Sequence, residues 1–557
     1  MPLKHSLNRI RWRLRATRRI WRPGGAPDLS AQAGEVPLGQ IDAPAAYATV
    51  RGSVAVKGWA MFPSGPAARV EMQLGERSLG RARLGLARPD IERLTATPSG
   101  AVSGFELSVD LAGYSGPDEA SDLRAVATGV AGERLELGPV RVRLAAAGRP
   151  ELPPIDRPRR KQPGDGKRRV LVFTHQLDAG GAQTFLVQLV RGLLDRGAIE
   201  PTVVSALNGP LRKDFERLGV TVHSGMGSPI DDLDSHLDRV EELTAWTESV
   251  GDFDAVLVNT ASPLASPGAE VAERLGIPAI WAIHESFSPA VLWADLDPGV
   301  RALSERALAN AAFAVFEAEA TQRLYEPAVG AARCLTRPYG LDIEPIDAER
   351  ASFDRERARR EAGIPGDAEV VLCVGTIEPR KAQVSLAQAF DLVAERHPRT
   401  HLVFLGAREN QNSRLLAEWA GSLRAAERIR LVPVTPDVGA WYGLSDLLVC
   451  ASDIESLPRT VLEAMAWELP VLATSVFGLP ELIADGETGW LCAERDVEAL
   501  AAALDRVLSI PAAERAEVGH AGRARVERRH SLDEYCDEIV KLLDEASQGT
   551  SAAPASL

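Results

Sequence analysis

The stretch from residue 446 to residue 475, DLLVCASDIESLPRTVLEAMAWELPVLATS, decides the fold. It begins and ends with short apolar runs, "DLLVCAS" and "PVLATS". Such runs are typical of strands buried in a parallel sheet whose two faces are covered by helices. Pro458 fits the first turn of the helix between them, where its missing N–H costs nothing. The stretch therefore predicts a strand, a loop, a helix and a second strand.

The same alternation extends on both sides of this stretch, and it starts twice. Continuous Val/Ile/Leu/Ala runs separated by amphipathic helices predict strands in both halves, namely 168–175, 201–207, 254–260, 278–284 and 311–318, then 369–376, 400–407 and 428–434. We infer two doubly wound α/β domains, residues 168–336 and 337–530. Ligands of such sheets bind at the carboxyl ends of the strands, so we expect the site in the cleft between the two domains.

The part before residue 168 has a different pattern of hydrophobic residues and turns. Residues 41–145 hold short runs of alternating polarity between Gly, Pro and Ser turns, which predict a small β-sandwich with Trp59, Phe62 and Phe105 in its core. Residues 146–167 are rich in Pro and charge and indicate a linker. At the other end, residues 531–546 predict a helix that packs back across the domains, and residues 547–557 a disordered tail.

Composition excludes several classes of protein. The chain has 557 residues and a net charge of −14, which argues against general nucleic-acid binding. Its five cysteines are scattered without a CxxC pair, as in a reducing cytoplasm. No apolar run reaches 18 residues, and no apolar segment near the start suggests a secretory signal. We expect a cytoplasmic protein.

Residues 1–22 depart from the acidic trend, with eight Lys/Arg and no acid. Read as a helix, they place Leu3, Leu7, Ile10, Leu14, Thr17 and Trp21 on one mostly apolar stripe, in which Thr17 is the only polar member. A basic amphipathic helix with tryptophan suits an anionic membrane surface, here the inner face of the plasma membrane. Docking on the chain's own acidic body, an oligomerisation arm and plain disorder are the alternatives.

The acids of the opening stretch are the first candidates for chemistry. Glu455 is expected in the loop after a strand and Glu463 about one turn into the following helix, so both can face one cleft. A carboxylate accepts the paired hydroxyls of a sugar, and a helix N-terminus favours phosphate. Together they suit a sugar nucleotide. The alternative is that both acids are solvated, flank the start of the helix and bind no ligand.

Three other pairs of residues follow predicted strands. Gly180 and Gly181 could let backbone N–H groups approach a phosphate, although an ordinary tight turn explains them as well. The pair formed by His284 and Glu285 could act on a substrate or cap the next helix. Adjacent cations at a strand end can hold a diphosphate or form a solvated pair; these are Arg380 and Lys381.

Residues 170–545 resemble a retaining glycosyltransferase of family 4 with the GT-B fold. The Glu-x7-Glu signature, Glu455 to Glu463, lies within "ESLPRTVLEAMA" and is followed by "PVLATSVFGLPELI". Supporting matches occur in order at 180–183 (GGAQ), 283–285 (IHE), 337–342 (RPYGLD), 374–381 (VGTIEPRK) and 486–492 (GETGWLC).

The resemblance implies a role for each matching residue. Glu463 would hold the donor's ribose hydroxyls, and Glu455 would contact the transferred sugar. The remaining implied positions are those that bind the diphosphate and line the donor pocket, namely Arg380, Lys381, Gly180, Gly181, Gly375, His284, Leu457, Pro458 and Arg459. The family needs no metal and no cofactor, because cations and helix dipoles stabilise the leaving group. The partners would be a nucleotide-sugar donor and a glycan or lipid-linked acceptor of surface polysaccharide.

Four positions depart from the family pattern. Thr376 replaces an arginine that would bind phosphate. At three other positions many members have glycine where this chain has a larger residue, namely Ala382, Glu468 and Phe477. The departures at Thr376 and Phe477 keep open a rival reading, a non-catalytic GT-B scaffold that binds glycan or a partner through its β-sandwich. A second rival is another GT-B enzyme, such as a sugar-nucleotide epimerase.

Overall fold

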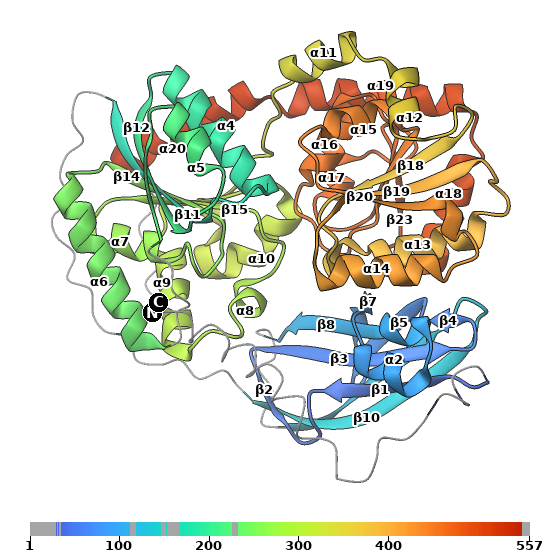
Figure 1. The fold of residues 1–557 in the computed structure, drawn as a ribbon. Helices are drawn as coiled ribbons and strands as arrows, with labels where there is room; N and C mark the ends of the chain where they lie inside the picture. Colours follow the sequence, from blue (N-terminus) through green and yellow to red (C-terminus); the bar gives the residue numbers. More distant parts are fainter. Residues whose placement is uncertain are drawn as a thin grey trace, which may run out of the picture.

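The structure, a computed structural model, describes residues 35–111, 119–145, 167–225 and 232–548, together with Leu29, Gln32 and Leu152. Figure 1 shows three bodies: an all-β domain lies below two α/β domains that stand side by side. The basic residues 1–22, nearly all of the linker 146–167 and the tail beyond residue 548 lie outside the described residues. Among the described helices, none has the length and apolarity to cross a membrane.

The first α/β domain is built on a parallel sheet with the strand order β13-β12-β11-β14-β15-β16-β17. Helices cover it, and the order reverses between β11 and β14, which is the switch point of a doubly wound sheet. Its elements are β11 (Arg168–Gln176), α4 (Gly181–Asp195), β12 (Ile199–Leu207), α5 (Arg212–Arg217), β13 (Thr221–Ser224), α6 (Leu233–Val250), β14 (Ala255–Asn259), α7 (Pro267–Leu275), β15 (Ala279–Ile283), α8 (Pro289–Leu292), α9 (Pro298–Ala309), β16 (Phe313–Phe316), α10 (Glu319–Val329), the 3₁₀ turn η2 (Ala331–Arg333) and β17 (Cys334–Thr336).

The second α/β domain repeats the plan with the order β20-β19-β18-β21-β22-β23. Its strands are β18 (Glu369–Val374), β19 (Thr400–Ala407), β20 (Ile429–Pro433), β21 (Leu447–Cys450), β22 (Val471–Thr474) and β23 (Trp490–Cys492). Its helices are α11 (Glu344–Ala351), α12 (Arg355–Glu361), η3 (Pro379–Lys381), α13 (Gln383–Val393), α14 (Gln411–Gly421), η4 (Ala426–Arg428), α15 (Val438–Leu444), α16 (Arg459–Ala466), α17 (Leu479–Leu482), α18 (Val497–Leu508) and α19 (Ala512–Arg529).

The doubly wound prediction is confirmed, and every predicted strand of both domains is present. Three short strands escaped prediction: β13, β17 and β23. Each has three or four residues and lies at a sheet edge, where a strand needs no long apolar run. All five cysteines are buried and unpaired.

The last helix, α20 (Leu532–Gln548), returns to the first α/β domain and packs against α4. Tyr535 meets Phe185 of α4 edge to face, with ring centroids 5.1 Å apart. Ion pairs continue the contact along the helix, since Arg196 binds Asp537 at 2.7 Å. The chain therefore crosses between the domains twice, once before α11 and once after α19.

The all-β region, here called the β-domain, contains ten strands in one continuous hydrogen-bonded sheet. Its elements are β1 (Leu38–Ala43), β2 (Thr49–Arg51), β3 (Ser53–Phe62), β4 (Gly65–Pro66), β5 (Arg69–Leu74), β6 (Arg77–Arg81), β7 (Arg83–Leu86), α2 (Pro89–Thr95), α3 (Pro98–Ala101), β8 (Gly104–Asp110), β9 (Glu119–Thr128) and β10 (Arg134–Ala145). Its two ends, β6 and β7, lie together because Ala82 alone separates them in the chain, and β7 also packs against β5. The sheet thus folds over a core that includes Phe62 and Phe105, whereas Trp59 packs in a separate cluster with Met61 and Ile91 of α2; all three predicted core residues are buried.

The backbone explains three departures from the family pattern. Ala382, Glu468 and Phe477 have φ angles of 52°, 59° and 43°, in the left-handed region. Glycine adopts this region freely, whereas another L-residue pays about 1–2 kcal/mol for it. The fold therefore demands glycine-like backbone at the places where many family members have glycine, and this chain accepts the strain.

We predict that Ala382→Gly relieves part of this strain. Ala394 is the matched control, because it is also a buried alanine beside α13, 2% exposed against 4% for Ala382, but has an ordinary φ of −57°. Both changes remove one buried methyl, whereas only Ala382→Gly releases strain. We expect the Ala382→Gly variant to be about 1–2 kcal/mol more stable than the Ala394→Gly variant in urea unfolding. Equal losses of stability would contradict the strain argument.

Candidate functional site

The candidate site lies where the carboxyl ends of the two sheets face each other. From the second domain, the loop after β21 carries Glu455, and α16 begins at Arg459 with Pro458 as its N-cap residue. Glu463 lies one turn into α16, as predicted. The turn η3, which follows β18, carries Arg380 and Lys381. The sequence therefore delivers an acid, two cations and a helix N-terminus to one edge of the sheet.

Glu455 forms the centre of an ion cluster. Its Oε1 accepts a hydrogen bond from Arg380 Nη1 at 3.1 Å, and it is also bonded by the ammonium group of Lys381. Ser452 donates to the same oxygen at 3.2 Å. Burial opposes ionisation of Glu455, but the two cations outweigh it and hold the pKa of this carboxyl below its usual value. Glu455 is therefore a buried anion at neutral pH.

Glu463 is held by a separate set of groups. Arg459 Nε donates to its Oε1 at 2.7 Å, and the hydroxyl of Tyr442 donates to its Oε2 at 2.9 Å. Burial, followed by the charge of Glu463, raises the pKa of Tyr442 well above its usual value, so the phenol stays a donor. Arg459 also reaches across to Gln188 of α4 at 2.7 Å. Tyr442 and Gln188 carry no motif, and sequence reasoning missed them.

On the first domain's side, both ring nitrogens of His284 are occupied. Nδ1 bonds the carboxylate of Glu317, and Nε2 lies 2.9 Å from Asn259 Oδ1. Burial lowers the pKa of His284, but the charge of Glu317 more than compensates, and the pKa is raised. Glu317 follows β16 in the same way as His284 follows β15, and that shared position was the signal that could have identified it.

Glu285, the neighbour of His284, has a structural role. Its Oε2 accepts from the N–H of Ala261 at 2.7 Å and from the N–H of His284 at 3.2 Å. It therefore holds the loop after β14 and the end of β15 together. Of the predicted His-Glu pair, His284 could bond a substrate only in exchange for its Nε2 contact with Asn259.

Two further polar residues of this edge were missed. The Nδ1 atom of His175 lies 3.1 Å from the hydroxyl of Thr260, and its Nε2 lies 3.1 Å from Gln183 Nε2. Burial, helped by the charge of His284, lowers the pKa of His175 to about 4, so this ring is neutral. Thr260 has φ = 85°, which is strained for a β-branched residue and is a feature that clusters at functional sites.

The glycines at the strand ends leave backbone groups open. Gly180 is the N-cap residue of α4. Because glycine has no side chain, it cannot cap the helix, and no side-chain cap bonds the first N–H groups of α4. A Cβ on Gly181 would meet nothing within 4 Å. Gly375 has φ = 141° and faces the Lys381 side chain, whose Cε lies 3.5 Å from an ideal Cβ. These features suit the close approach of an anion.

Leu457 contributes differently from the rest of its motif. Its side chain is 5% exposed and belongs to the apolar core, while its carbonyl accepts from the Tyr339 hydroxyl at 2.8 Å. Pro458 is likewise buried. Their contribution to a donor pocket is therefore to shape the backbone that leads from Glu455 to α16.

Comparison with known proteins agrees with this geometry. Residues 354–525 match the family "Glycosyl transferases group 1", and residues 179–344 match "Glycosyltransferase Family 4". A D-inositol 3-phosphate glycosyltransferase of Actinosynnema mirum is 31% identical over 399 residues, which are 66% of this chain and 90% of that protein. Its counterpart in Thermomonospora curvata is 28% identical over 418 residues, 68% and 94% of the two chains. The chain belongs to glycosyltransferase family 4.

Solved structures show the corresponding fold. Anabaena HepE in complex with UDP has a TM-score of 0.57 and 18% identity, over 68% of this chain and 100% of HepE. Sucrose-phosphate synthase from Thermosynechococcus elongatus gives a TM-score of 0.57 at 17% identity, over 69% and 100%. The GT-B prediction is confirmed. Both family matches lie within residues 179–525, so the β-domain of this glycosyltransferase is an addition to the shared part.

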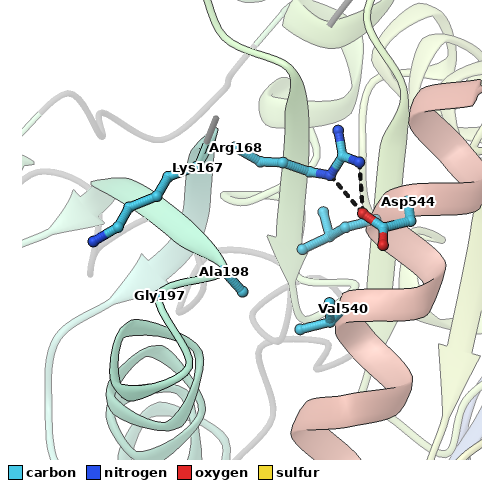
Figure 2. Close-up of a pocket in the computed structure, with 7 residues that line it drawn as sticks. Lys167, Arg168, Gly197, Ala198, Val540 and Asp544 are labelled. Carbon is cyan, nitrogen blue, oxygen red and sulfur yellow. Dashed lines mark hydrogen bonds and ion pairs between the residues drawn. The ribbon is translucent and has the colours of Figure 1, made fainter. Parts of the chain in front are cut away.

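A cavity of about 220 Å³ lies elsewhere in the glycosyltransferase, between the start of β11 and α20. Figure 2 shows Arg168 reaching Asp544 of α20, with an N–O distance of 2.6 Å. This is the amino end of β11, opposite to the edge that carries the ion cluster. The cavity is therefore separate from the candidate site. Among the described residues, no three His, Cys, Asp or Glu side chains gather as a metal site would require.

Asp453 is a buried acid beside the ion cluster that sequence reasoning did not single out. Its side chain is 2% exposed, and its N–H donates to the carbonyl of Arg380 at 2.8 Å. Burial raises the pKa of Asp453 to about 7, although the charges of Arg495 and Arg83 work against the shift. The folded protein therefore holds a proton that the unfolded chain releases near pH 4.

This proton makes stability depend on pH. Because the folded-state pKa is raised, the contribution of Asp453 is fully present below pH 4 and is lost as the pH rises from about 4 to about 7. We predict that Asp453→Asn, which cannot ionise, loses less stability across this interval than the wild type. Urea unfolding at pH 5, 6, 7 and 8 measures the two slopes. Identical slopes would show that Asp453 is ionised in the folded protein throughout.

Proposed function

We propose that this chain transfers a sugar from a nucleotide-sugar donor to a glycan or lipid-linked acceptor, with retention at the anomeric carbon and without a metal. The pathway we propose is the synthesis of cell-surface polysaccharide. The observation that carries the proposal is the Glu455–Arg380–Lys381 cluster beside Glu463 at the start of α16. Anabaena HepE, which shares this fold, has been solved in complex with UDP-glucose, and this supports a nucleotide sugar as donor.

The donor's diphosphate would bind between the two domains. Arg380 and Lys381 supply positive charge from η3, and the N-termini of α4 and α16 supply N–H groups that no side chain caps. In the structure both cations are paired with Glu455, which keeps the cluster neutral enough to remain buried. A bound diphosphate would bring a second anion to the same cations and share them with Glu455.

The donor's ribose would bind at Glu463. Each carboxylate oxygen already accepts one hydrogen bond, from Arg459 or from Tyr442, and each has a second lone pair for a ribose hydroxyl. The two existing bonds fix the orientation of the carboxylate before the donor arrives. Such preorganisation lowers the entropy lost on binding.

In the transfer step, the bond between the anomeric carbon and the diphosphate oxygen breaks, and a bond to the acceptor oxygen forms. The proton of the acceptor hydroxyl leaves on the diphosphate. Arg380 and Lys381 would stabilise the charge that develops on the leaving group, and Glu455 the positive charge on the sugar. His284, whose Nδ1 is held by Glu317, would exchange its Nε2 contact with Asn259 for a hydrogen bond donated to the sugar near the reacting carbon.

The departure at Thr376 reduces the phosphate-binding charge. Its carbonyl accepts from the Gln383 side chain at 3.0 Å, which ties this strand end to the start of α13. Two cations, rather than three, would therefore meet the diphosphate. The scaffold rival rests on this departure, and the epimerase rival on the shared fold. A new glycosidic product would exclude both.

We predict that Glu463→Ala abolishes efficient use of the donor. Loss of two hydrogen bonds to a charged acceptor costs about 1.5–3 kcal/mol each, so we expect KM for the donor to rise at least tenfold. The assay follows release of free nucleotide from a panel of nucleotide sugars. Glu498→Ala is the control, because Glu498 is an exposed acid on α18, remote from α16 in sequence.

The possible outcomes separate the readings. Release from one donor by the wild type, lost in the Glu463→Ala variant and kept in the Glu498→Ala variant, supports the transferase and names the sugar. An unchanged rate in the Glu463→Ala variant contradicts the assigned role. If the wild type releases no nucleotide and calorimetry detects no binding to any member of the panel, the scaffold reading replaces the transferase.

We further propose that residues 1–22 hold the enzyme at an anionic membrane surface. The support is the eight Lys/Arg without an acid, in a chain whose net charge is −14. Deletion of residues 1–22 is predicted to abolish co-sedimentation with vesicles that contain phosphatidylserine, and about 0.5 M salt to weaken it for the full chain. Unchanged binding of the truncated chain would contradict the proposal.

A further inference from the structure

The β-domain docks on the second α/β domain beside the catalytic cations. Strand β7 packs against η3 and against α13. The approach is close at Gly85, where an added Cβ would lie 2.7 Å from Val384 Cβ. Since η3 carries Arg380 and Lys381, a strand of the β-domain supports the turn from which both cations project.

Polar contacts extend this interface to the start of α18. The carboxylate of Asp496, which also caps α18, forms ion pairs with Arg69 at 3.1 Å and with Arg81 at 3.4 Å. The N–H of Val497 donates to the carbonyl of Ala68 at 3.0 Å. Asp496 is 8% exposed and the two arginines are 29% and 31% exposed, so these ion pairs are partly shielded from water.

Arg495 connects this interface to the ion cluster. Its Nη1 donates to the carbonyl of Arg81 in the β-domain at 2.7 Å, and its Nη2 donates to the carbonyl of Asp453 at 3.3 Å. The N–H of Asp453 in turn donates to the carbonyl of Arg380. A continuous chain of hydrogen bonds thus runs from β6 through Arg495 to the loop of Glu455 and to the turn of the cations.

The backbone of Arg495 adds an independent sign of constraint. Its φ angle is 53°, in the left-handed region that disfavours a side chain. Strain of this kind persists only where the surrounding contacts determine the conformation, and here it directs the guanidinium between the β-domain and the Asp453 loop. A passive tether between domains would need neither this conformation nor contacts at the catalytic turn.

We propose that the β-domain is a structural part of the donor site, and that Arg495 is the positioning residue through which it fixes the loop of Glu455 and the turn of Arg380 and Lys381. The inference rests on the proposed function for its catalytic consequence. Binding of the donor's ribose is assigned to Glu463, which is held by Tyr442 and Arg459 of α15 and α16, and these residues are bonded to one another and to Gln188 of α4 rather than to the β-domain. Loosening the interface should therefore lower turnover more than affinity for the nucleoside, which lacks the diphosphate that meets Arg380 and Lys381.

Two independent sets of full-length variants test this. Arg495→Ala removes the connection, and Arg495→Lys keeps a donor at the same strained backbone. Arg69→Ala combined with Arg81→Ala weakens the interface from the β-domain side. The matched controls are Arg424→Ala, an exposed arginine paired with Asp391 on the second domain, and Arg141→Ala, an exposed arginine paired with Asp122 on the β-domain.

We expect Arg495→Ala and the double variant to lower kcat tenfold or more, with the dissociation constant for the donor's nucleoside, uridine if the donor carries UDP, changed less than threefold. Misplacing a catalytic group by about 1 Å can cost a factor of about 100. Arg495→Lys should recover part of kcat, and both controls should stay within twofold of the wild type. An unchanged kcat, or an equal loss of nucleoside affinity, would overturn the proposal.

Hydrogen–deuterium exchange of the ligand-free chain gives a readout that does not depend on the proposed reaction. We expect faster exchange in residues 376–382 and 451–457 of both sets of variants, while β19 and β22 exchange as in the wild type. Exchange that is unchanged, or faster throughout the domain, would overturn the positioning role. If the wild type transfers no sugar, this measurement still decides whether the β-domain fixes these two segments.

Discussion

The pairing of Glu455 with Arg380 and Lys381 is the constraint on which the site depends. The side chains of Glu455 and Lys381 are 10% and 13% exposed and so largely removed from water, where a charge without a partner costs several kcal/mol. Arg380 is more exposed, at 37%, and pairs with Glu378 as well. The acid comes from the loop after β21 and the cations from the turn after β18, and these two strands are neighbours in the sheet. Folding of the parallel sheet and neutralisation of the cluster are therefore one event. The charges of the cluster are thus fixed in place by the fold itself.

Patterns within a few residues of sequence were enough to predict the local structure. The buried strands, Pro458 at the start of α16 and the placement of Glu463 one turn later all follow from periodicity and cap chemistry within a few residues. The groups that complete the site come from far away in the chain. Gln188 reaches Arg459 across 271 positions, and Tyr442 carries no motif of its own. No spacing rule could place these two beside α16, whereas Glu317 had one sequence signal, its position at the end of a predicted strand.

The strained positions show how a family pattern and a backbone requirement relate. Ala382 directly follows Lys381, and Phe477 precedes Gly478, whose added Cβ would lie 2.1 Å from the carbonyl oxygen of Ser456. At Gly478 the fold tolerates no side chain, so the glycine is kept. At Ala382 and Phe477 it demands only an unusual φ, so a larger residue can remain at a cost in strain. The family pattern shows glycine at both kinds of position. Only the structure distinguishes a position that has no room for a side chain from one that needs only a left-handed φ.

The β-domain also touches the first α/β domain, since α8 packs against β3 and β8. It therefore contacts both sides of the cleft, but unequally. Toward the second domain it has buried ion pairs, backbone hydrogen bonds and a shared apolar core, whereas toward the first its main contact within the described residues is the short helix α8. When two interfaces restrain one movement, the weaker one separates first. An opening of the cleft would therefore break the α8 contact together with the Arg459–Gln188 bond, while the β-domain moves with the cations that it supports.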